Sequence, residues 1–207
     1  TSGKTDMSYM FQACYSLVAI PQLDTRNVTD MSYMFSRCYS LSCLPPLNMS
    51  RVQWHKYFIT ECYSLISIPV FDVSFSYNLE GFASSCYALK SVSLITSAKA
   101  SIRTNAFNMC RSLQKVELDM MSFTGSGNLG GNLQSLTNLL LKNLAVSMYI
   151  SSSPLLSKES LLYIINNEAA TSAITITLHS YAYSRLAEDA GIVAALANHP
   201  NISLASA

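Results

Sequence analysis

The sequence predicts an α/β solenoid whose rungs are about 24 residues long and share one curved parallel sheet. Residues 7–30, 31–54 and 55–78 begin almost alike, as MSYMFQACYSL, MSYMFSRCYSL and HKYFITECYSL. A cysteine recurs at the same phase of each repeat, at Cys14, Cys38, Cys62, Cys86 and Cys110. Self-similarity at one fixed period between about 20 and 50 residues is the signature of a stacked repeat array.

The interior of each rung is predicted by apolar residues at fixed distances from its cysteine. Three residues after the cysteine stand Leu17, Leu41, Leu65, Leu89 and Leu113, and six after it stand Ile20, Leu44, Ile68, Val92 and Val116. Apolar pairs such as Met34 and Phe35 precede the cysteine. Each unit is therefore a short extended segment joined to a turn, and neither half can bury its apolar side without a neighbouring rung.

Prolines set the expected length of the first three strands. Pro21, Pro45 and Pro69 occupy one position of the repeat, seven residues after the cysteine. Proline cannot donate a hydrogen bond to a ladder, so we expect these strands to be short and to end there. Ser93 and Glu117 hold the same position in the fourth and fifth rungs, which should carry longer strands.

The five cysteines of the column are expected to be buried free thiols. Residues one repeat apart lie about 4.8 Å apart in a parallel ladder, and their parallel Cβ vectors leave them beyond the ~3.8 Å mean Cβ separation of a disulfide. Cys43 stands outside the column. We interpret it as a chance substitution, with an exposed reactive or intermolecular thiol as the alternative.

Composition excludes two kinds of partner. The charged residues make up 12% of the chain and the formal net charge is +1, with no block of basic residues, so nucleic acid is not an expected partner. No run of about 18 uncharged apolar residues exists, so no membrane-spanning segment is expected. The 50% hydrophobic content fits an array in which every rung buries several side chains.

The 24-residue cysteine period ends after Cys110, and the pattern of the sequence changes toward the C-terminus. A sixth rung resumes one residue early at Leu133, and residues 146–150 are a candidate seventh strand. Residues 157–167 are predicted to form a helix with Ser157 as its N-cap. A strand at 173–178, a helix at 184–198 and a last strand at 202–205 complete the predicted order. We therefore divide the chain into a solenoid at 1–150 and a capping region at 151–207 that continues the same sheet.

Two segments carry a resemblance to a known family. Residues 106–118, AFNMCRSLQKVEL, are similar to the A-F-x-x-C-x-x-L-x-x-[IV]-x-L rung of the BspA-like leucine-rich repeats of bacterial surface proteins. Residues 27–35, NVTDMSYMF, resemble the N-V-T-x-M-x-x-M-F variant of that rung. The resemblance covers about residues 5–120 and implies a right-handed leucine-rich-repeat solenoid with an extracellular or cell-surface location. Because Thr5-Asp6-Met7 echoes Thr29-Asp30-Met31, we also expect further chain upstream of Thr1.

No catalytic, cofactor or metal site is nominated. The segment 125–130, GSGNLG, matches G-x-G-x-x-G, but a dinucleotide site also needs a preceding strand, a following helix and an acidic residue about 20 positions on. The nearest later acid is Glu159. His55, His179 and His199 are scattered along the chain, and no Cys/His cluster has the spacing of a zinc site. We expect no cofactor and no enzyme activity.

Tyrosines provide the candidate binding surface, because that side chain offers a large apolar area with a polar tip. The family pattern has a small polar residue after the cysteine, whereas this chain has tyrosine there. The candidate residues form two repeating positions, Tyr9, Tyr33 and Tyr57 before the cysteines and Tyr15, Tyr39, Tyr63 and Tyr87 after them. They could contact sugar rings or a protein, or they could only shield the core. The outward sheet positions, such as Ser91 and Ser93, offer no aromatic or arginine anchor.

Two functional hypotheses follow. The first is a non-enzymatic binding or adhesion module that recognises a protein or glycan through an extended repeat face, displayed at a bacterial surface or secreted. The second is a structural spacer or assembly domain of a larger surface or phage-tail-like protein. Both rest on the repeat architecture, and the step from fold to function is an analogy.

Overall fold

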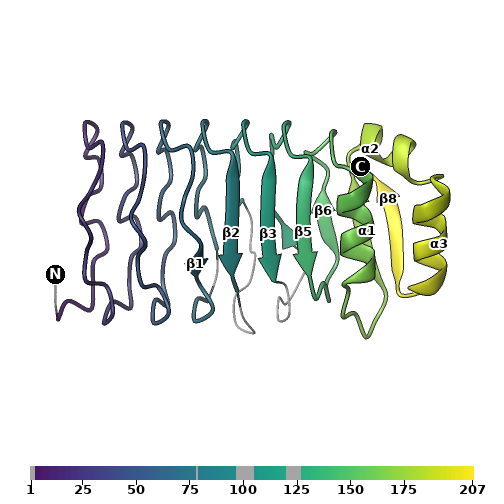
Figure 1. Cartoon of the computed structure of the whole chain (residues 1–207), viewed down its shortest axis with the longest axis horizontal. Coiled ribbons are helices and arrows are strands. Elements are labelled where there is room, and N and C mark those ends of the chain that lie inside the picture. The colour runs from purple at the N-terminus through teal and green to yellow at the C-terminus, as the bar shows by residue number, and fades with distance from the viewer. Residues whose placement is uncertain (1–2, 78, 97–104, 120–126) are drawn as a thin grey trace.

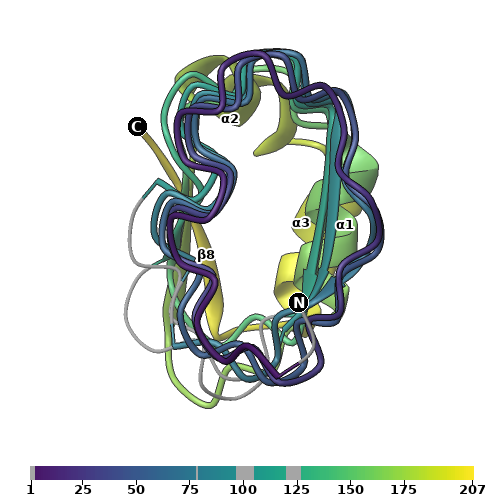
Figure 2. The same ribbon diagram turned by 90° about the vertical axis from the view of Figure 1, so that its left-hand side faces the viewer.

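The computed structural model describes residues 3–77, 79–96, 105–119 and 127–207. The rungs stack side by side along one long axis (Figure 1), and a view along that axis superposes the N-terminal rungs in one oval outline (Figure 2). Two sheets of short parallel strands run along this stack, and aromatic rings stack from rung to rung. The arrangement is that of an α/β repeat solenoid.

The first sheet contains four parallel strands in the order β1, β2, β3 and β5. These strands are β1 (Phe71–Asp72), β2 (Ser91–Ile95), β3 (Lys115–Asp119) and β5 (Asn138–Lys142). Val92 pairs with Val116, one full period later, and Val116 pairs with Leu139, one residue short of the next period. The pairing confirms that the sixth rung resumes one residue early. Along β2 and β3 inward side chains are buried at alternate positions, as a pleated strand requires.

Prolines do shorten the strands of the first rungs, but not where the sequence suggested. Among the described residues before Phe71, adjacent rungs are joined by isolated bridges such as Asp6–Asp30 rather than by strands. In the third rung β1 begins after Pro69, so the prediction that this strand ends at the proline is wrong. Proline lacks an N–H, and regular pairing begins two residues beyond it. The five-residue strands β2 and β3 confirm the longer strands expected of the fourth and fifth rungs.

A second parallel sheet corrects the prediction of one curved sheet. It consists of β4 (Gly127–Asn128), β6 (Met148–Ile150), β7 (Ile174–Leu178) and β8 (Ile202–Ser206) in that order. The strands at the C-terminal end therefore continue this second sheet and not the first. In the view along the axis, β8 and the strands of the first sheet lie on opposite sides of the outline (Figure 2).

Helices take over the side of the first sheet beyond β5. Helix α1 (Lys158–Asn166) and helix α3 (Ala190–Asn198) lie on that side of the outline (Figure 2). Ile174 of β7 pairs with Ile202 of β8, so the repeat that contains α3 is longer than the N-terminal repeats. A helix rises 1.5 Å per residue and a strand about 3.3 Å, so a rung that contains a helix needs more residues to span the same side.

The N-terminus of α1 closes the edge of the first sheet. Ser157 is the N-cap, as predicted, and its hydroxyl accepts a hydrogen bond from the Ser160 N–H at 3.1 Å. The buried Ser160 hydroxyl accepts from the Leu139 N–H at 2.8 Å and donates to the Thr137 carbonyl at 3.1 Å. These bonds satisfy groups at the β5 edge that a further strand would otherwise pair, so the helix ends the sheet.

The predicted helix at 184–198 is two helices. Helix α2 (Ser180–Leu186) ends before Asp189, and the Asp189 carboxylate accepts hydrogen bonds from the N–H groups of Gly191 and Ile192 at 2.9 and 3.3 Å. An aspartate that caps a new helix competes with continuation of the old one. Apolar periodicity alone did not reveal this break.

Candidate functional site

The tyrosines that were predicted as a binding surface form two stacked columns. We call Tyr9, Tyr33 and Tyr57 the first tyrosine column and Tyr15, Tyr39, Tyr63 and Tyr87 the second tyrosine column. Ring centroids are 5.0 and 5.2 Å apart in the first, and 4.8, 4.8 and 5.0 Å apart in the second. All five pairs are stacked, with ring planes within 26° of parallel. The faces of the inner rings therefore cover one another, and each column offers ring edges and hydroxyls to a partner.

Backbone hydrogen bonds fix the first tyrosine column. The N–H groups of Tyr9 and Tyr33 each donate to a carbonyl of the next rung at 2.9 Å. The three tyrosines have φ values of 52–60°, in the left-handed region. Gly81 and Asn105 occupy the same repeat position with φ values of 59° and 70°. Glycine and asparagine are the residues that usually adopt this conformation, and tyrosine is not.

The two columns end differently. The Tyr57 ring lies against Gly81, where an added Cβ would come within 2.2 Å of a ring carbon, so no larger residue fits at that position. The second column is followed one repeat later by Arg111, whose guanidinium lies 5.7 Å from the centre of the Tyr87 ring. A cation at that distance from an aromatic ring is attracted to its face. The second column thus continues from four phenols to a guanidinium.

Two of the column hydroxyls donate to carboxylates, and their pKa values are raised by burial first and by those carboxylates second. The Tyr63 hydroxyl donates to Glu61 at 3.2 Å, and burial together with the charge of Glu61 raises the pKa of Tyr63 to about 12. The Tyr57 hydroxyl donates to Glu80 at 3.2 Å, and burial and that carboxylate raise the pKa of Tyr57 as well. Lys56 forms an ion pair with Glu80 at 3.0 Å. Both phenols stay neutral at physiological pH.

The cysteine column lies inside the solenoid except at its first member. Cys38, Cys62, Cys86 and Cys110 are buried free thiols, as predicted, but Cys14 is exposed. Each buried thiol donates to a backbone carbonyl of the preceding rung, at 2.9–3.1 Å. In this structure the rung of Cys14 has a described neighbour on one side only, which leaves its thiol uncovered. Cys43, outside the column, is also exposed.

Thiol reactivity should separate these two groups. Burial raises the pKa of Cys38 and of Cys110 to about 12 and that of Cys86 well above its ordinary value, so the reactive thiolate is suppressed. We expect iodoacetamide at pH 8 to modify Cys14 and Cys43 in the native chain and all six cysteines in guanidinium chloride. Peptide mass spectrometry checks this. Rapid native labelling of Cys62 or Cys86 would contradict the burial of the column.

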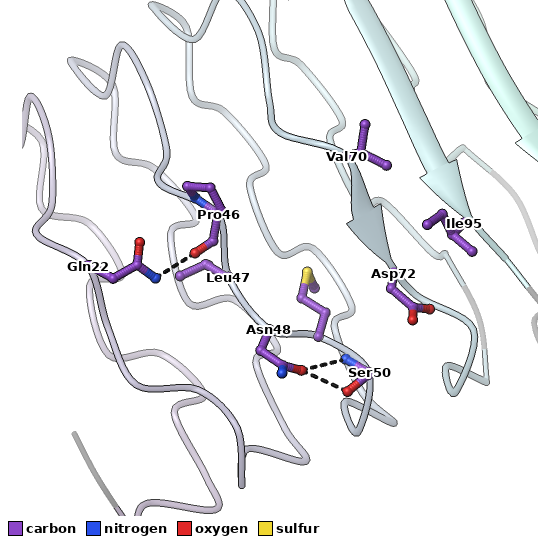
Figure 3. A pocket seen from close by; sticks show the side chains of 9 residues that line it. Gln22, Pro46, Leu47, Asn48, Ser50, Val70, Asp72 and Ile95 are labelled. Carbon is purple, nitrogen blue, oxygen red and sulfur yellow. Dashed lines mark hydrogen bonds between the residues drawn. The ribbon is translucent and has the colours of Figure 1, made fainter.

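A shallow groove lies across the first four rungs, and the predicted outward positions Ser91 and Ser93 are not among its lining residues. It has a volume of about 450 Å³, and its lining residues include Gln22, Pro46, Val70 and Ile95 (Figure 3). Val70 is 61% exposed. Gln22, Pro46 and Val70 stand eight residues after a cysteine and Ile95 nine, so the predicted outward positions, five and seven residues after each cysteine, did not include them.

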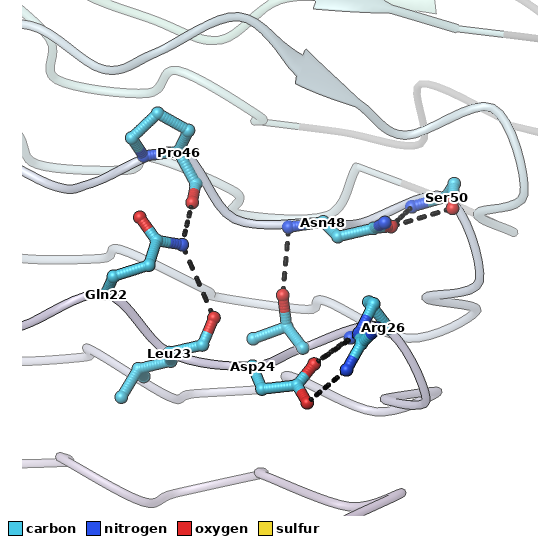
Figure 4. Close-up of polar contacts among 8 residues, drawn as sticks. Gln22, Leu23, Asp24, Arg26, Pro46, Asn48 and Ser50 are labelled. Atoms are coloured by element: carbon cyan, nitrogen blue, oxygen red, sulfur yellow. Dashed lines mark hydrogen bonds and ion pairs between the residues drawn. The ribbon is translucent and has the colours of Figure 1, made fainter. Parts of the chain in front are cut away.

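Polar contacts between turns border the groove (Figure 4). The Gln22 side-chain amide donates to the Pro46 carbonyl at 2.6 Å, which ties the first rung to the second. Asp24 accepts two hydrogen bonds from the Arg26 guanidinium at 3.0 Å, and these bonds lower the pKa of Asp24 to about 2. The side chains of Gln22, Asn48 and Ser50, which line the groove, thus already have hydrogen-bond partners.

The three histidines do not come together. His55 lies in the core, His179 is the N-cap of α2, and His199 lies 3.4 Å from Glu168 at the end of α3. Across residues 3–77, 79–96, 105–119 and 127–207, no group of three or more His, Cys, Asp and Glu side chains is placed to hold a metal ion. Gly125 and Ser126 of the glycine motif lie outside the described residues, and Gly127 and Asn128 form β4, with no helix following directly.

One exposed aromatic cluster was missed altogether. Trp54, Tyr77 and Phe75 are exposed, and the rings of Trp54 and Tyr77 are 5.0 Å apart. Trp54 pairs with Asp30, which pairs with Asp6, so a tryptophan occupies a position where earlier rungs have aspartate. That break in a repeating column was the available signal.

No helix among the described residues has the length and apolar character needed to cross a membrane.

Parallel sheets and aromatic rings that stack at the period of the rungs define a class, the α/β repeat proteins with solenoid-like stacking. The chain belongs to the DUF285 family, whose model is described as a Mycoplasma protein of unknown function and matches residues 1–119. The match includes both tyrosine columns and all five members of the cysteine column. No curated protein and no solved structure shows significant similarity to the chain.

Proposed function

We propose that this chain is a non-enzymatic binding module that recognises a protein through its two tyrosine columns. The finer fold assignment belongs to the same proposal: a right-handed leucine-rich-repeat solenoid of the BspA-like kind. The resemblance of residues 27–35 and 106–118 to BspA-like rungs supports it, and it is the basis for placing the module at a bacterial cell surface or among secreted proteins.

The backbone conformation of the first tyrosine column is the observation that carries the proposal. An ordinary L-residue in the left-handed region costs roughly 1–2 kcal/mol relative to its preferred conformations. Gly81 and Asn105 show that the turn can be built with residues that reduce this cost. The backbone alone therefore does not call for tyrosine at this position, and what the tyrosines add there is the stacking of their rings. Left-handed residues of other types recur at another position of the repeat, from Ala13 to Met109, without forming such a stack.

The geometry of the columns favours a protein over a sugar as the partner. Sugars pack on the open face of an aromatic ring, whereas the faces of the inner rings are covered by their neighbours in the column. Rows of ring edges and hydroxyls match the surfaces of protein interfaces, where tyrosine is enriched and contributes many of the strongest contacts.

A test removes the two inner rings of the second tyrosine column. We expect the double variant Tyr39→Ala/Tyr63→Ala to bind at least about tenfold more weakly than the wild type to the protein partner found in a panel of purified extracellular-matrix proteins. Biolayer interferometry measures the affinity, and circular dichroism checks that the variant is folded. Tyr149→Ala is the matched control, because Tyr149 is exposed on β6 outside both columns.

Equal binding by the double variant and the wild type would contradict the role of the columns.

The second candidate function is a structural spacer or assembly domain, which the continuous ladder of hydrogen bonds between rungs would suit. Light scattering distinguishes the two, because an assembly domain should self-associate and a binding module should remain monomeric while binding its partner. Failure of all panel proteins to bind, together with self-association, would favour the spacer.

A further inference from the structure

The single tryptophan of the chain lies in an exposed aromatic pair outside both tyrosine columns. Trp54 is 47% exposed and Tyr77 is 44% exposed. Their ring centroids are 5.0 Å apart and their planes are inclined by 39°, so the rings do not cover each other as completely as those of the near-parallel Tyr63–Tyr87 pair. The pair therefore offers aromatic surface to a ligand in a way that the inner rings of the columns do not.

A pocket of about 340 Å³ lies on the two turns that carry this pair and on the equivalent turn of the preceding rung. Its lining residues are Thr29, Ser50, Arg51, Gln53 and Phe75. The Tyr77 N–H donates to the Gln53 carbonyl at 3.2 Å, and Trp54 follows Gln53 directly in the chain. The backbone of the aromatic pair is thus joined to that of a pocket residue, while the two rings are not among the lining residues. The pocket combines one apolar wall with an amide, a guanidinium and two hydroxyls. The Thr29 and Ser50 hydroxyls donate to the Thr5 carbonyl and to the Asn48 side chain, so toward a ligand they act as acceptors. A few polar groups around an apolar wall are typical of a small-molecule site.

Arg51 is the charged residue among those that line the pocket. Within the part of the chain that the structure describes, its guanidinium has no ion pair and no hydrogen bond, unlike Arg26, which is paired with Asp24. A guanidinium offers parallel N–H donors that fit the two oxygens of a carboxylate. The pocket is therefore suited to a ligand that carries an anionic group.

We propose that these residues form a binding site for a carbohydrate that carries a carboxylate, such as a uronic acid or a sialic acid. The aromatic pair and Phe75 would contact the apolar C–H surface of the sugar, Gln53 and the hydroxyls of Thr29 and Ser50 would bond its hydroxyls, and Arg51 would bind its carboxylate. The site goes beyond the function proposed above, because it shares no residue with the tyrosine columns and takes a different ligand.

The lone tryptophan makes the test direct, because excitation at long wavelength reports on Trp54 alone. The probes are a hyaluronan tetrasaccharide, which carries uronic acids, and sialyllactose, with lactose as the matched neutral sugar. We expect a saturable change in Trp54 fluorescence with at least one acidic sugar and at least about tenfold weaker binding of lactose, because charge-assisted hydrogen bonds are the stronger ones. The response to each acidic probe distinguishes uronic from sialic acid.

Arg51→Gln should weaken binding of the responding sugar by about tenfold or more while Trp54 still reports. Isothermal titration calorimetry of Trp54→Ala, which has no fluorescence signal of its own, should show the same loss. Arg111→Gln is the control, since Arg111 contacts the second tyrosine column and not this pocket. No saturable response to either acidic sugar, equal affinity for lactose, or unchanged binding by Arg51→Gln would each overturn the proposal.

The two functional proposals fail separately. The double variant Tyr39→Ala/Tyr63→Ala should keep the full fluorescence response to the acidic sugar, and Arg51→Gln should keep the affinity for the protein partner. Loss of sugar binding in the double variant would overturn the independence of the pocket. Loss of protein binding in that variant alone bears only on the columns.

Discussion

Replacing Phe58 with alanine is expected to lower the free energy of unfolding by about 3–5 kcal/mol, the usual range for truncating a buried phenylalanine. Phe58 is fully buried and its ring lies 5.4–6.1 Å from the rings of Phe35, Phe71 and Phe82. The contacts reach residues of the rungs on both sides. Removal of this ring opens a cavity where three rungs meet, and a stack of rungs depends on such contacts between neighbours.

Urea denaturation followed by circular dichroism measures the effect of Phe58→Ala. The matched control is Ile66→Ala in the same rung, whose side chain is 51% exposed and whose loss should change stability by no more than about 0.5 kcal/mol. A loss below about 1 kcal/mol for Phe58→Ala would show that the aromatic core does not hold the rungs together, because truncation of a buried phenylalanine ordinarily costs about 3–5 kcal/mol.

The second large effect is a loss of stability in acid that depends on His55. This side chain is buried, its ring packs edge-on against Phe82 at 5.2 Å, and neither ring nitrogen has a hydrogen-bond partner among the described residues. Burial lowers the pKa of His55 to about 4. The unfolded chain takes up a proton below about pH 6.5, and the folded chain does not until about pH 4, so stability falls as the pH falls between these values.

The expected loss attributable to His55 is about 2 kcal/mol between pH 7 and pH 5, since one unit of pKa shift corresponds to about 1.4 kcal/mol. His55→Met should remove this loss and raise stability at pH 5, because methionine has no group to protonate. Met7 and Met31 hold the same repeat position as His55 and are buried. Urea denaturation of both proteins at pH 7 and pH 5 checks the effect. Equal pH dependence of the wild type and His55→Met would contradict it.

The period of the sequence was sufficient to predict which residues stack. Because each position recurs at one fixed period, the cysteine and tyrosine columns followed from counting, and the structure brings both together. The same count could have placed His55 in the core, since Met7, Met31 and Leu79 lie at the same position. That position is held by methionine, histidine and leucine in different rungs, so its repeat is less evident in the sequence than that of the cysteines.

Other features depend on geometry that counting does not supply. The assignment of β7 and β8 to the second sheet depends on α1 and α3 occupying the side of the first, which the alternation of apolar residues in a strand does not reveal. The exposure of Trp54 depends on how one large side chain fits a position held by Asp30 in the rung before. The tyrosine rings cover one another's faces and leave their edges uncovered because their planes are nearly parallel. The spacing of the rungs does not determine that orientation of the rings.

The stacking of equivalent residues on successive rungs is the claim on which both binding proposals depend. A crystal of the chain measured at long wavelength, where sulfur scatters anomalously, tests it most directly. The account predicts anomalous peaks for Cys38, Cys62, Cys86 and Cys110 in one row, spaced by about 4.8 Å, the separation of neighbouring strands in a ladder. Cysteine peaks that do not lie in a row, or that are paired at about 2.05 Å as disulfides, would contradict it; the peaks of the nine methionines are assigned separately.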